Sequence, residues 1–122
     1  MPSILVIDDD PLLRSFARVA LERGGYAVRE AADGADGLLA LEQEPADLVL
    51  CDVFMPGESG LGVLRHLHHR CRRVKVLAMS GGSPRFAGDF LGVARRLGAV
   101  GALAKPFGVT ELLGAVERAL AG

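Results

Sequence analysis

The sequence predicts an α/β fold in which a doubly wound parallel sheet carries helices on both faces. Short apolar runs alternate along the chain with segments whose apolar residues recur at helical spacing. The runs are apolar along most of their length, as is typical of parallel strands buried on both faces, and right-handed crossovers place helices on each side. Half of the 122 residues are apolar, so one domain over residues 1–122 with a single core is expected.

Five apolar runs are the expected strands, and five helices are expected around them. The strands are predicted at 4–7, 26–28, 48–51, 74–79 and 100–104. The first helix has the clearest boundaries, with Asp10 as N-cap, Pro11 at the first helical position and Gly24-Gly25 as its end. The other helices are predicted, from their apolar spacing, at about 35–44, 60–69, 86–97 and 109–120.

The composition argues against several classes of protein. The 14 basic and 15 acidic residues nearly cancel, so no global field attracts the chain to nucleic acid or to an anionic membrane. Cys51 and Cys71 lack the CxxC spacing of a zinc site and are too few for a disulfide framework, so both are expected to be reduced thiols. A secretory leader and an apolar run of about 18 residues are both missing from the sequence. We therefore expect a soluble cytoplasmic protein.

Polar residues of unusual kind follow four of the predicted strands. Asp8 and Asp9 come after the first strand, Asp52 after the third, Ser80 after the fourth and Lys105 after the fifth. The carboxyl ends of parallel strands share one edge of the sheet, and ligands bind there at the point where neighbouring connections leave to opposite faces. These five distant residues are therefore expected to converge on one site.

The expected site contains three carboxylates, which repel one another unless a cation compensates their charge. Magnesium prefers oxygen ligands, and Asp8, Asp9 and Asp52 together with a backbone carbonyl could supply them. Such an ion would shield an incoming phosphate donor while a carboxylate attacks phosphorus to form an aspartyl-phosphate. Lys105 would pair with the transferred oxygens, and Ser80 would donate a hydrogen bond to them.

The motifs ILVIDDDPLLR, DLVLCDVFMPGESG, VLAMSGG and ALAKPF resemble those of response-regulator receiver domains of two-component signalling. The resemblance runs over essentially the whole chain. It implies a flavodoxin-like fold with a five-stranded parallel sheet of order 2-1-3-4-5 and five helices. It also implies a stand-alone receiver similar to the chemotaxis regulators.

Carried over position by position, the resemblance implies a set of magnesium ligands. Asp9 becomes a direct ligand, Asp8 an acid that acts largely through water, and Phe54 the residue whose backbone carbonyl binds the ion. Asp52 becomes both a ligand and the phosphoacceptor. The expected cofactor is therefore Mg²⁺.

The resemblance also implies how the phosphoryl group is received and read out. Ser80 becomes the switch hydroxyl, and Lys105 the lysine that pairs with phosphate, followed by a cis peptide before Pro106. The implied phosphodonor is the phosphohistidine of a histidine kinase or of a histidine phosphotransfer protein, approaching near the first helix, Pro106 and Phe107. Signalling would then proceed by contact with a downstream protein or by phosphorelay, and the only catalysis expected is phosphotransfer and autodephosphorylation.

Three features depart from the pattern of the family. Ala102 occupies the position where receivers commonly carry an aromatic residue that follows the switch hydroxyl. The 25 positions from Ser80 to Lys105 exceed the usual span, which enlarges the loop beside the site. Phe54 is bulkier than the usual residue two positions after the phosphoacceptor, so an altered rate of dephosphorylation is expected.

Two other functions compete with this interpretation. A haloacid-dehalogenase-type phosphatase has an Asp-x-Asp motif, a Ser and a Lys in the order of Asp8-x-Asp10, Ser80 and Lys105, but it needs a second acidic pair beyond the lysine. Only Glu111 and Glu117 follow, within a predicted helix. A phosphate-independent interaction module would be consistent with Ala102 and the long loop, although the acids, hydroxyl and lysine are all present.

Overall fold

A computed structural model describes residues 1–53, 62, 74–81, 90–96 and 98–122 of the chain. All strands belong to one parallel sheet of order β2-β1-β3-β4-β5, which confirms the predicted fold class and strand order. The strand bounds are β1 Ser3–Ile7, β2 Ala27–Ala31, β3 Leu48–Asp52, β4 Lys75–Ser80 and β5 Gly101–Ala104. Each of them overlaps a predicted strand.

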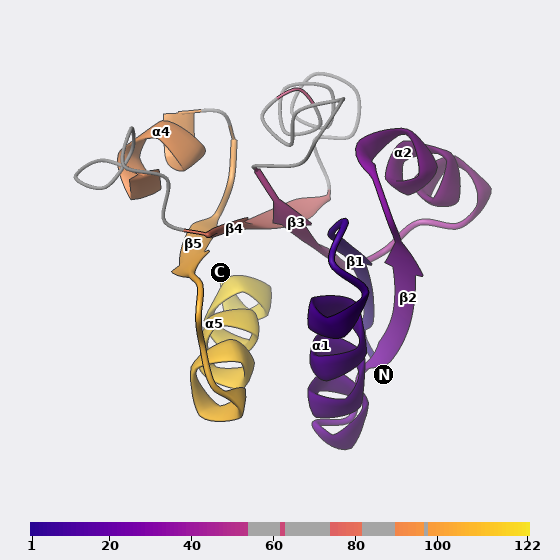
Figure 1. The fold of residues 1–122 in the computed structure, drawn as a ribbon, viewed down its shortest axis with the longest axis horizontal. Helices are drawn as coiled ribbons and strands as arrows, with labels where there is room; N and C mark the ends of the chain where they lie inside the picture. Colours follow the sequence, from indigo (N-terminus) through magenta and orange to yellow (C-terminus); the bar gives the residue numbers. More distant parts are fainter. Residues whose placement is uncertain (54–61, 63–73, 82–89, 97) are drawn as a thin grey trace.

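Helices cover both faces of this sheet (Figure 1). The described helices are α1 Pro11–Arg23, α2 Gly34–Gln43, α4 Phe90–Arg96 and α5 Val109–Ala121. Figure 1 shows α1 and α5 on one face, with α2 and α4 on the other. The helix predicted at about 60–69, apart from residue 62, and parts of the one predicted at about 86–97 lie outside the described residues.

The two faces of the sheet build two separate hydrophobic cores. Along β1, Ile4 and Val6 pack into the core that includes residues of α1 and α5. Leu5 and Ile7 point the other way, into the core that includes residues of α2 and α4. All four side chains are completely buried, which explains why this strand reads as a continuous apolar run rather than as an alternating one.

The boundaries of α1 follow from its capping residues, as predicted. The Asp10 carboxylate accepts a hydrogen bond from the backbone N–H of Leu12 at 2.9 Å, and Pro11 occupies the first turn. The helix ends at Arg23 with Gly24 as its C-cap, followed by Gly25 with a φ of 95°, a conformation that favours glycine. The helix start is thereby fixed two residues after the pair Asp8-Asp9.

The register of the sheet brings the polar strand ends to one edge. Ile7 pairs with Cys51, Asp52 with Met79, and Ser80 with Ala104. Beyond the last pair, the backbone N–H of Lys105 donates to the carbonyl of Ser80 at 2.8 Å. The peptide between Lys105 and Pro106 is cis, as the family resemblance implies.

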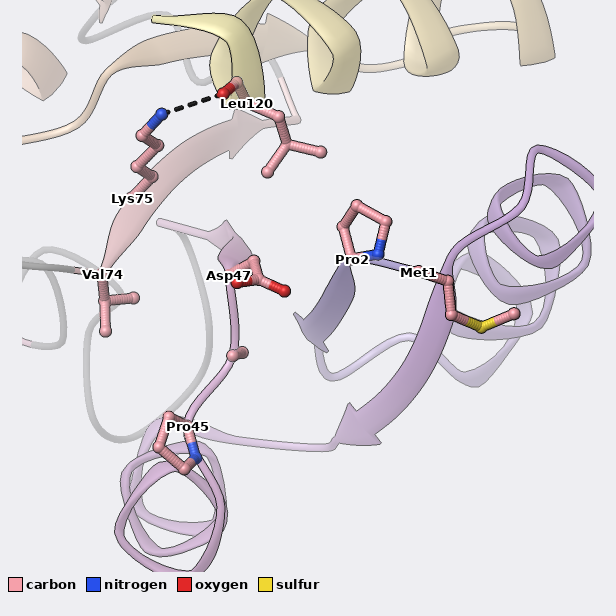
Figure 2. A pocket seen from close by; sticks show the side chains of 8 residues that line it. Met1, Pro2, Pro45, Asp47, Val74, Lys75 and Leu120 are labelled. Atoms are coloured by element: carbon pink, nitrogen blue, oxygen red, sulfur yellow. Dashed lines mark hydrogen bonds between the residues drawn. The ribbon is translucent and has the colours of Figure 1, made fainter.

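A pocket of about 740 Å³ opens at the opposite edge, where the strands begin (Figure 2). Its charged groups already have partners: Asp47 accepts from the backbone N–H of Ser3 at 2.7 Å, and the Lys75 ammonium donates to the carbonyl of Leu120 at 3.0 Å. The pocket lies at the edge of the sheet opposite to Asp8, Asp9 and Asp52. Because Asp47 and Lys75 are already paired, it is poorly suited to a charged ligand. Within the described part of the chain, no helix is long and apolar enough to cross a membrane.

Replacing Gly37 with alanine should destabilise the protein by about 1–2 kcal/mol. The glycine is buried in α2 against Ile7, and an added Cβ would lie 2.9 Å from the Ile7 Cγ1 and also clash with its Cδ1. Overpacking of about 1–3 kcal/mol should outweigh the helix propensity gained from alanine, about 0.5–1 kcal/mol. Urea unfolding followed by circular dichroism measures the difference in free energy of unfolding.

Gly114→Ala is the matched control, because Gly114 lies inside α5 and its added Cβ would meet only the end of the flexible Arg118 side chain, at 3.2 Å. This variant should be as stable as the wild type or slightly more stable. A Gly37→Ala protein as stable as Gly114→Ala would contradict the close packing of α2 on Ile7.

Cys51 should be inert to thiol reagents in the folded protein. It is completely buried, and burial, reinforced by the negative charges of Asp52 and Asp8, raises the pKa of its thiol to about 12. Since the thiolate is the reactive form, an aromatic disulfide should label a Cys71→Ser variant only after denaturation. Rapid stoichiometric labelling under native conditions would contradict this environment; the same variant in guanidinium chloride is the control.

Candidate functional site

Two buried carboxylates and one ammonium form the centre of the site at the carboxyl edge of the sheet. The Lys105 Nζ lies 2.7 Å from the Asp8 Oδ2 and 3.1 Å from the Asp52 Oδ2. Asp8 is 0% exposed and Asp52 is 4% exposed. The three residues come from the ends of β1, β3 and β5, so the topology of the sheet brings them together as predicted.

The Asp8 carboxylate is held on both of its oxygens. Its Oδ1 accepts a hydrogen bond from the backbone N–H of Asp10 at 2.9 Å, while its Oδ2 faces Lys105. Burial raises the pKa of this carboxyl, and the hydrogen bonds from Lys105 and Asp10 oppose that shift without cancelling it. The Asp8 carboxyl therefore binds a proton more readily than an ordinary aspartate.

Lys105 carries the compensating positive charge. Burial alone would lower the pKa of its ammonium, but the hydrogen bonds and charges of Asp8 and Asp52 outweigh burial and raise it. The lysine is therefore protonated at neutral pH. One ammonium cannot neutralise two buried carboxylates and the neighbouring Asp9, so the ionised site keeps an excess of negative charge.

The donor set fits a hard metal ion. Carboxylate oxygens of Asp8, Asp9 and Asp52 all lie within 4.8 Å of one another, with Asp9 exposed and the other two buried. Oxygen donors around one point are what Mg²⁺ and similar cations prefer, and the excess negative charge favours a dication. These three acids could hold a metal ion. Phe54, the expected fourth protein ligand, lies outside the described residues.

Ser80 and Ala102 lie on neighbouring strands at or near this edge. Ser80 is the last residue of β4 and is 5% exposed, and its carbonyl accepts from the Lys105 backbone. Ala102 lies on β5 and packs against the core on the α2 and α4 side of the sheet. The position that carries an aromatic residue in many receivers thus presents only a methyl group to this core.

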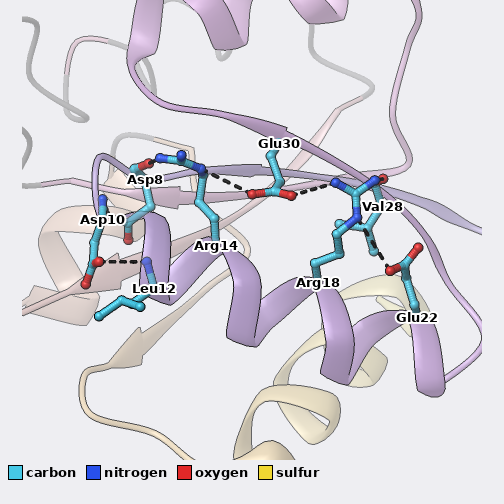
Figure 3. A network of polar contacts seen from close by, with 8 residues as sticks. All are labelled: Asp8, Asp10, Leu12, Arg14, Arg18, Glu22, Val28 and Glu30. Carbon is cyan, nitrogen blue, oxygen red and sulfur yellow. Dashed lines mark hydrogen bonds and ion pairs between the residues drawn. The ribbon is translucent and has the colours of Figure 1, made fainter.

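A network of arginines and glutamates beside Asp8 was missed by sequence reasoning (Figure 3). The Arg14 Nη1 donates to the backbone carbonyl of Asp8 at 2.8 Å, and its Nε donates to Glu30 at 3.2 Å. The sequence places Arg14 and Arg18 on the polar face of α1, but only the pairing of β1 with β2 brings Glu30 beside them. The signal available in the sequence was the position of Arg14, one helical turn after the Asp10 cap, which places it near the acids that precede the helix.

Comparison with known proteins identifies the family. The family model of the response regulator receiver domain matches residues 4–117. The transcriptional regulatory protein GltR of Pseudomonas aeruginosa is 35% identical over 120 residues, covering 97% of this chain and 48% of GltR. Sporulation initiation phosphotransferase F of Bacillus subtilis is 30% identical over 117 residues, covering 96% of this chain and 92% of that protein. The chain spans about half or less of the length of GltR and of several other curated relatives.

Solved structures agree with this match over almost the full length of the chain. A receiver domain protein from Clostridium thermocellum superposes with a TM-score of 0.88 at 28% identity, covering 99% of this chain and 95% of that one. The chemotaxis response regulator CheY4 of Vibrio cholerae gives a TM-score of 0.86 at 27% identity, covering 98% of each chain. These matches confirm the resemblance drawn from the motifs. The chain belongs to the response regulator receiver family.

Proposed function

We propose that Asp52 is the phosphoacceptor of this receiver and that Asp8, Asp9, Ser80 and Lys105 complete its site. One observation carries the proposal: the Asp52 carboxylate lies at the carboxyl edge of the sheet, 3.1 Å from the Lys105 ammonium and within 4.8 Å of two further carboxylates. Burying a charged group is costly to the stability of the fold. A buried carboxylate in such a cluster therefore indicates a chemical role rather than a contribution to stability.

The reaction is a phosphoryl transfer between two side chains. A carboxylate oxygen of Asp52 attacks phosphorus, forming an O–P bond, while the P–N bond of a phosphohistidine breaks. The imidazole nitrogen leaves with the electron pair and takes up a proton. The product is an aspartyl-phosphate on Asp52, which water can later hydrolyse to restore the carboxylate and release inorganic phosphate.

Magnesium is the proposed cofactor, held directly by carboxylate oxygens of Asp9 and Asp52 and by the backbone carbonyl of Phe54, with Asp8 acting largely through water. When bound, it neutralises charge on the donor oxygens, so that an anionic carboxylate can approach an anionic phosphoryl group. Lys105 then pairs with a transferred oxygen, since its ammonium already contacts Asp52. Ser80, the last residue of β4, donates a hydrogen bond from its hydroxyl to another oxygen of the transferred phosphoryl group.

The donor is proposed to be a histidine kinase or a histidine phosphotransfer protein. Support comes from the family and from the bacterial regulators and phosphotransferase that the chain resembles. Residues 1–122 are proposed to act as one receiver domain in the cytoplasm, with output through a downstream protein contact or a phosphorelay. The near-zero net charge of −1 favours contact with protein over contact with nucleic acid.

The competing functions have less support. The match to the receiver family leaves the haloacid-dehalogenase-type phosphatase without a supporting observation. A function as a phosphate-independent interaction module does not explain why two carboxylates are buried in contact with a single ammonium. Ala102 instead suggests that the switch is read out through residues other than the usual aromatic.

The proposal is tested by incubating the protein with acetyl phosphate, with and without magnesium, and measuring its intact mass. The wild type should gain one phosphoryl group only when magnesium is present, and Asp52→Asn should gain none. Asp47→Asn is the matched control, because Asp47 is an exposed acid at the opposite edge of the sheet. Equal modification of wild type and Asp52→Asn, or none of the wild type under any condition, would overturn the assignment.

Magnesium affinity should fall as the pH is lowered, starting above the range of an ordinary aspartate. Burial raises the pKa of Asp8, so its carboxyl becomes protonated, and its negative charge is lost from the metal site, at a higher pH than for an ordinary aspartate. Calorimetric titrations with MgCl₂ between about pH 8 and about pH 5 measure the effect. Asp8→Asn should bind magnesium more weakly and with a flatter pH profile. An affinity that stays constant over this interval would contradict the role of Asp8.

A further inference from the structure

The backbone carbonyl of Asp8 has a side-chain partner that no part of the proposed chemistry uses. This carbonyl belongs to the peptide group that joins Asp8 to Asp9, and it accepts from the Arg14 Nη1 at 2.8 Å (Figure 3). Since a peptide group is planar and rigid, restraining its oxygen also restrains the nitrogen and Cα of Asp9. Arg14 therefore constrains the link between two of the three clustered acids.

Asp9 depends on this constraint more than the other two acids. Asp8 and Asp52 are buried and both contact Lys105, which holds their carboxylates in place. The carboxylate of Asp9 is exposed, and among the residues that the structure describes it has no hydrogen bond or ion pair. Its position relative to the other acids is therefore set by the backbone of the turn between β1 and α1.

Arg14 is in turn held by Glu30 on β2. The Arg14 Nε lies 3.2 Å from the Glu30 Oε1, and the other oxygen of Glu30 accepts from the Arg18 Nη1 at 2.5 Å. Arg18 also donates to the backbone carbonyl of Val28 at 3.0 Å, which ties the glutamate and both arginines to the same strand. Arg14 and Glu30 are only 19% and 24% exposed, so solvent screens this pair less than a surface pair.

We propose that Arg14, oriented by Glu30, is a positioning residue for metal binding: it holds the Asp8–Asp9 peptide so that Asp9 meets the other two acids. The proposal rests on the proposed function, because it concerns the same metal site. The guanidinium suits this role because its rigid fork donates in two fixed directions, here to a carboxylate and to a carbonyl. Outer groups that orient metal ligands typically change metal affinity about 10–100-fold when removed.

The effect of Arg14 on magnesium affinity should have a distinctive sign. If the geometry did not change, removing a cation beside three carboxylates would strengthen the binding of a dication. If Arg14 positions Asp9, its removal should instead weaken binding, by about tenfold. The direction of the change therefore separates positioning from a simple effect of charge.

The test is calorimetric titration of the full chain with MgCl₂. We expect an about tenfold weaker affinity in Arg14→Ala and partial rescue in Arg14→Lys, whose ammonium can reach one acceptor but cannot reproduce the fork. Glu30→Ala should weaken binding less than Arg14→Ala. The double variant should lose no more than Arg14→Ala alone, because Glu30 acts through Arg14.

Arg29→Ala is the matched control for the loss of an arginine that holds backbone carbonyls. Arg29 also lies on β2, and it donates to the carbonyls of Ala40 and Glu44 at 3.1 and 2.7 Å, at the end of α2. This variant should lose stability to urea yet keep the magnesium affinity of the wild type.

A second readout is the rate of phosphorylation by acetyl phosphate. Arg14→Ala should need about tenfold more magnesium to reach its half-maximal rate, and its rate should recover to that of the wild type at saturating magnesium.

Each outcome decides between the hypotheses. Unchanged or tighter magnesium binding in Arg14→Ala and Arg14→Lys would overturn the positioning role and leave the proposed function intact. Equal weakening in Arg29→Ala would also overturn it, because general destabilisation would then explain the loss. A wild-type protein that binds no magnesium would overturn the proposed function itself. If Arg14→Ala does not fold, Arg14→Lys and Glu30→Ala carry the same comparison.

Discussion

The structure is organised around two buried carboxylates that share one ammonium. Asp8 and Asp52 lie at the carboxyl ends of the neighbouring strands β1 and β3, where burial alone would make two negative charges very unfavourable. Lys105 contacts both, and that contact depends on the pairing of β1 with β3, of β3 with β4 and of β4 with β5. The negative charge that remains, together with Asp9, is what suits this edge to a cation.

Most of the fold, and the convergence of Asp8, Asp9, Asp52 and Lys105 at one edge of the sheet, could be predicted from the sequence. The apolar runs and the Asp10-Pro11 helix start are local signals, and the structure has strands and α1 where they predict them. Asp8, Asp9, Asp52, Ser80 and Lys105 could be grouped because all follow predicted strands, and the carboxyl ends of parallel strands share an edge. Here the topology turns a one-dimensional pattern into a three-dimensional cluster.

The contacts around the site could not be predicted in the same way. Arg14 reaches Glu30 sixteen positions away, and neither residue belongs to a motif with chemical meaning. Their contact depends on how α1 packs on β2, and the helix periodicity shows only that Arg14 lies on a polar face. The raised pKa of Asp8 likewise follows from its complete burial, whereas the sequence shows an acidic run that resembles an exposed loop.

The wide spacing of the site along the chain has a consequence for synthesis in the cell. Asp8 and Lys105 are 97 positions apart, and their contact joins the first strand to the last. During translation the acids leave the ribosome well before the lysine, so a nascent chain carries Asp8 and Asp52 without the ammonium that compensates them. Under the proposed function, a phosphodonor that requires the assembled edge would not modify an unfinished chain.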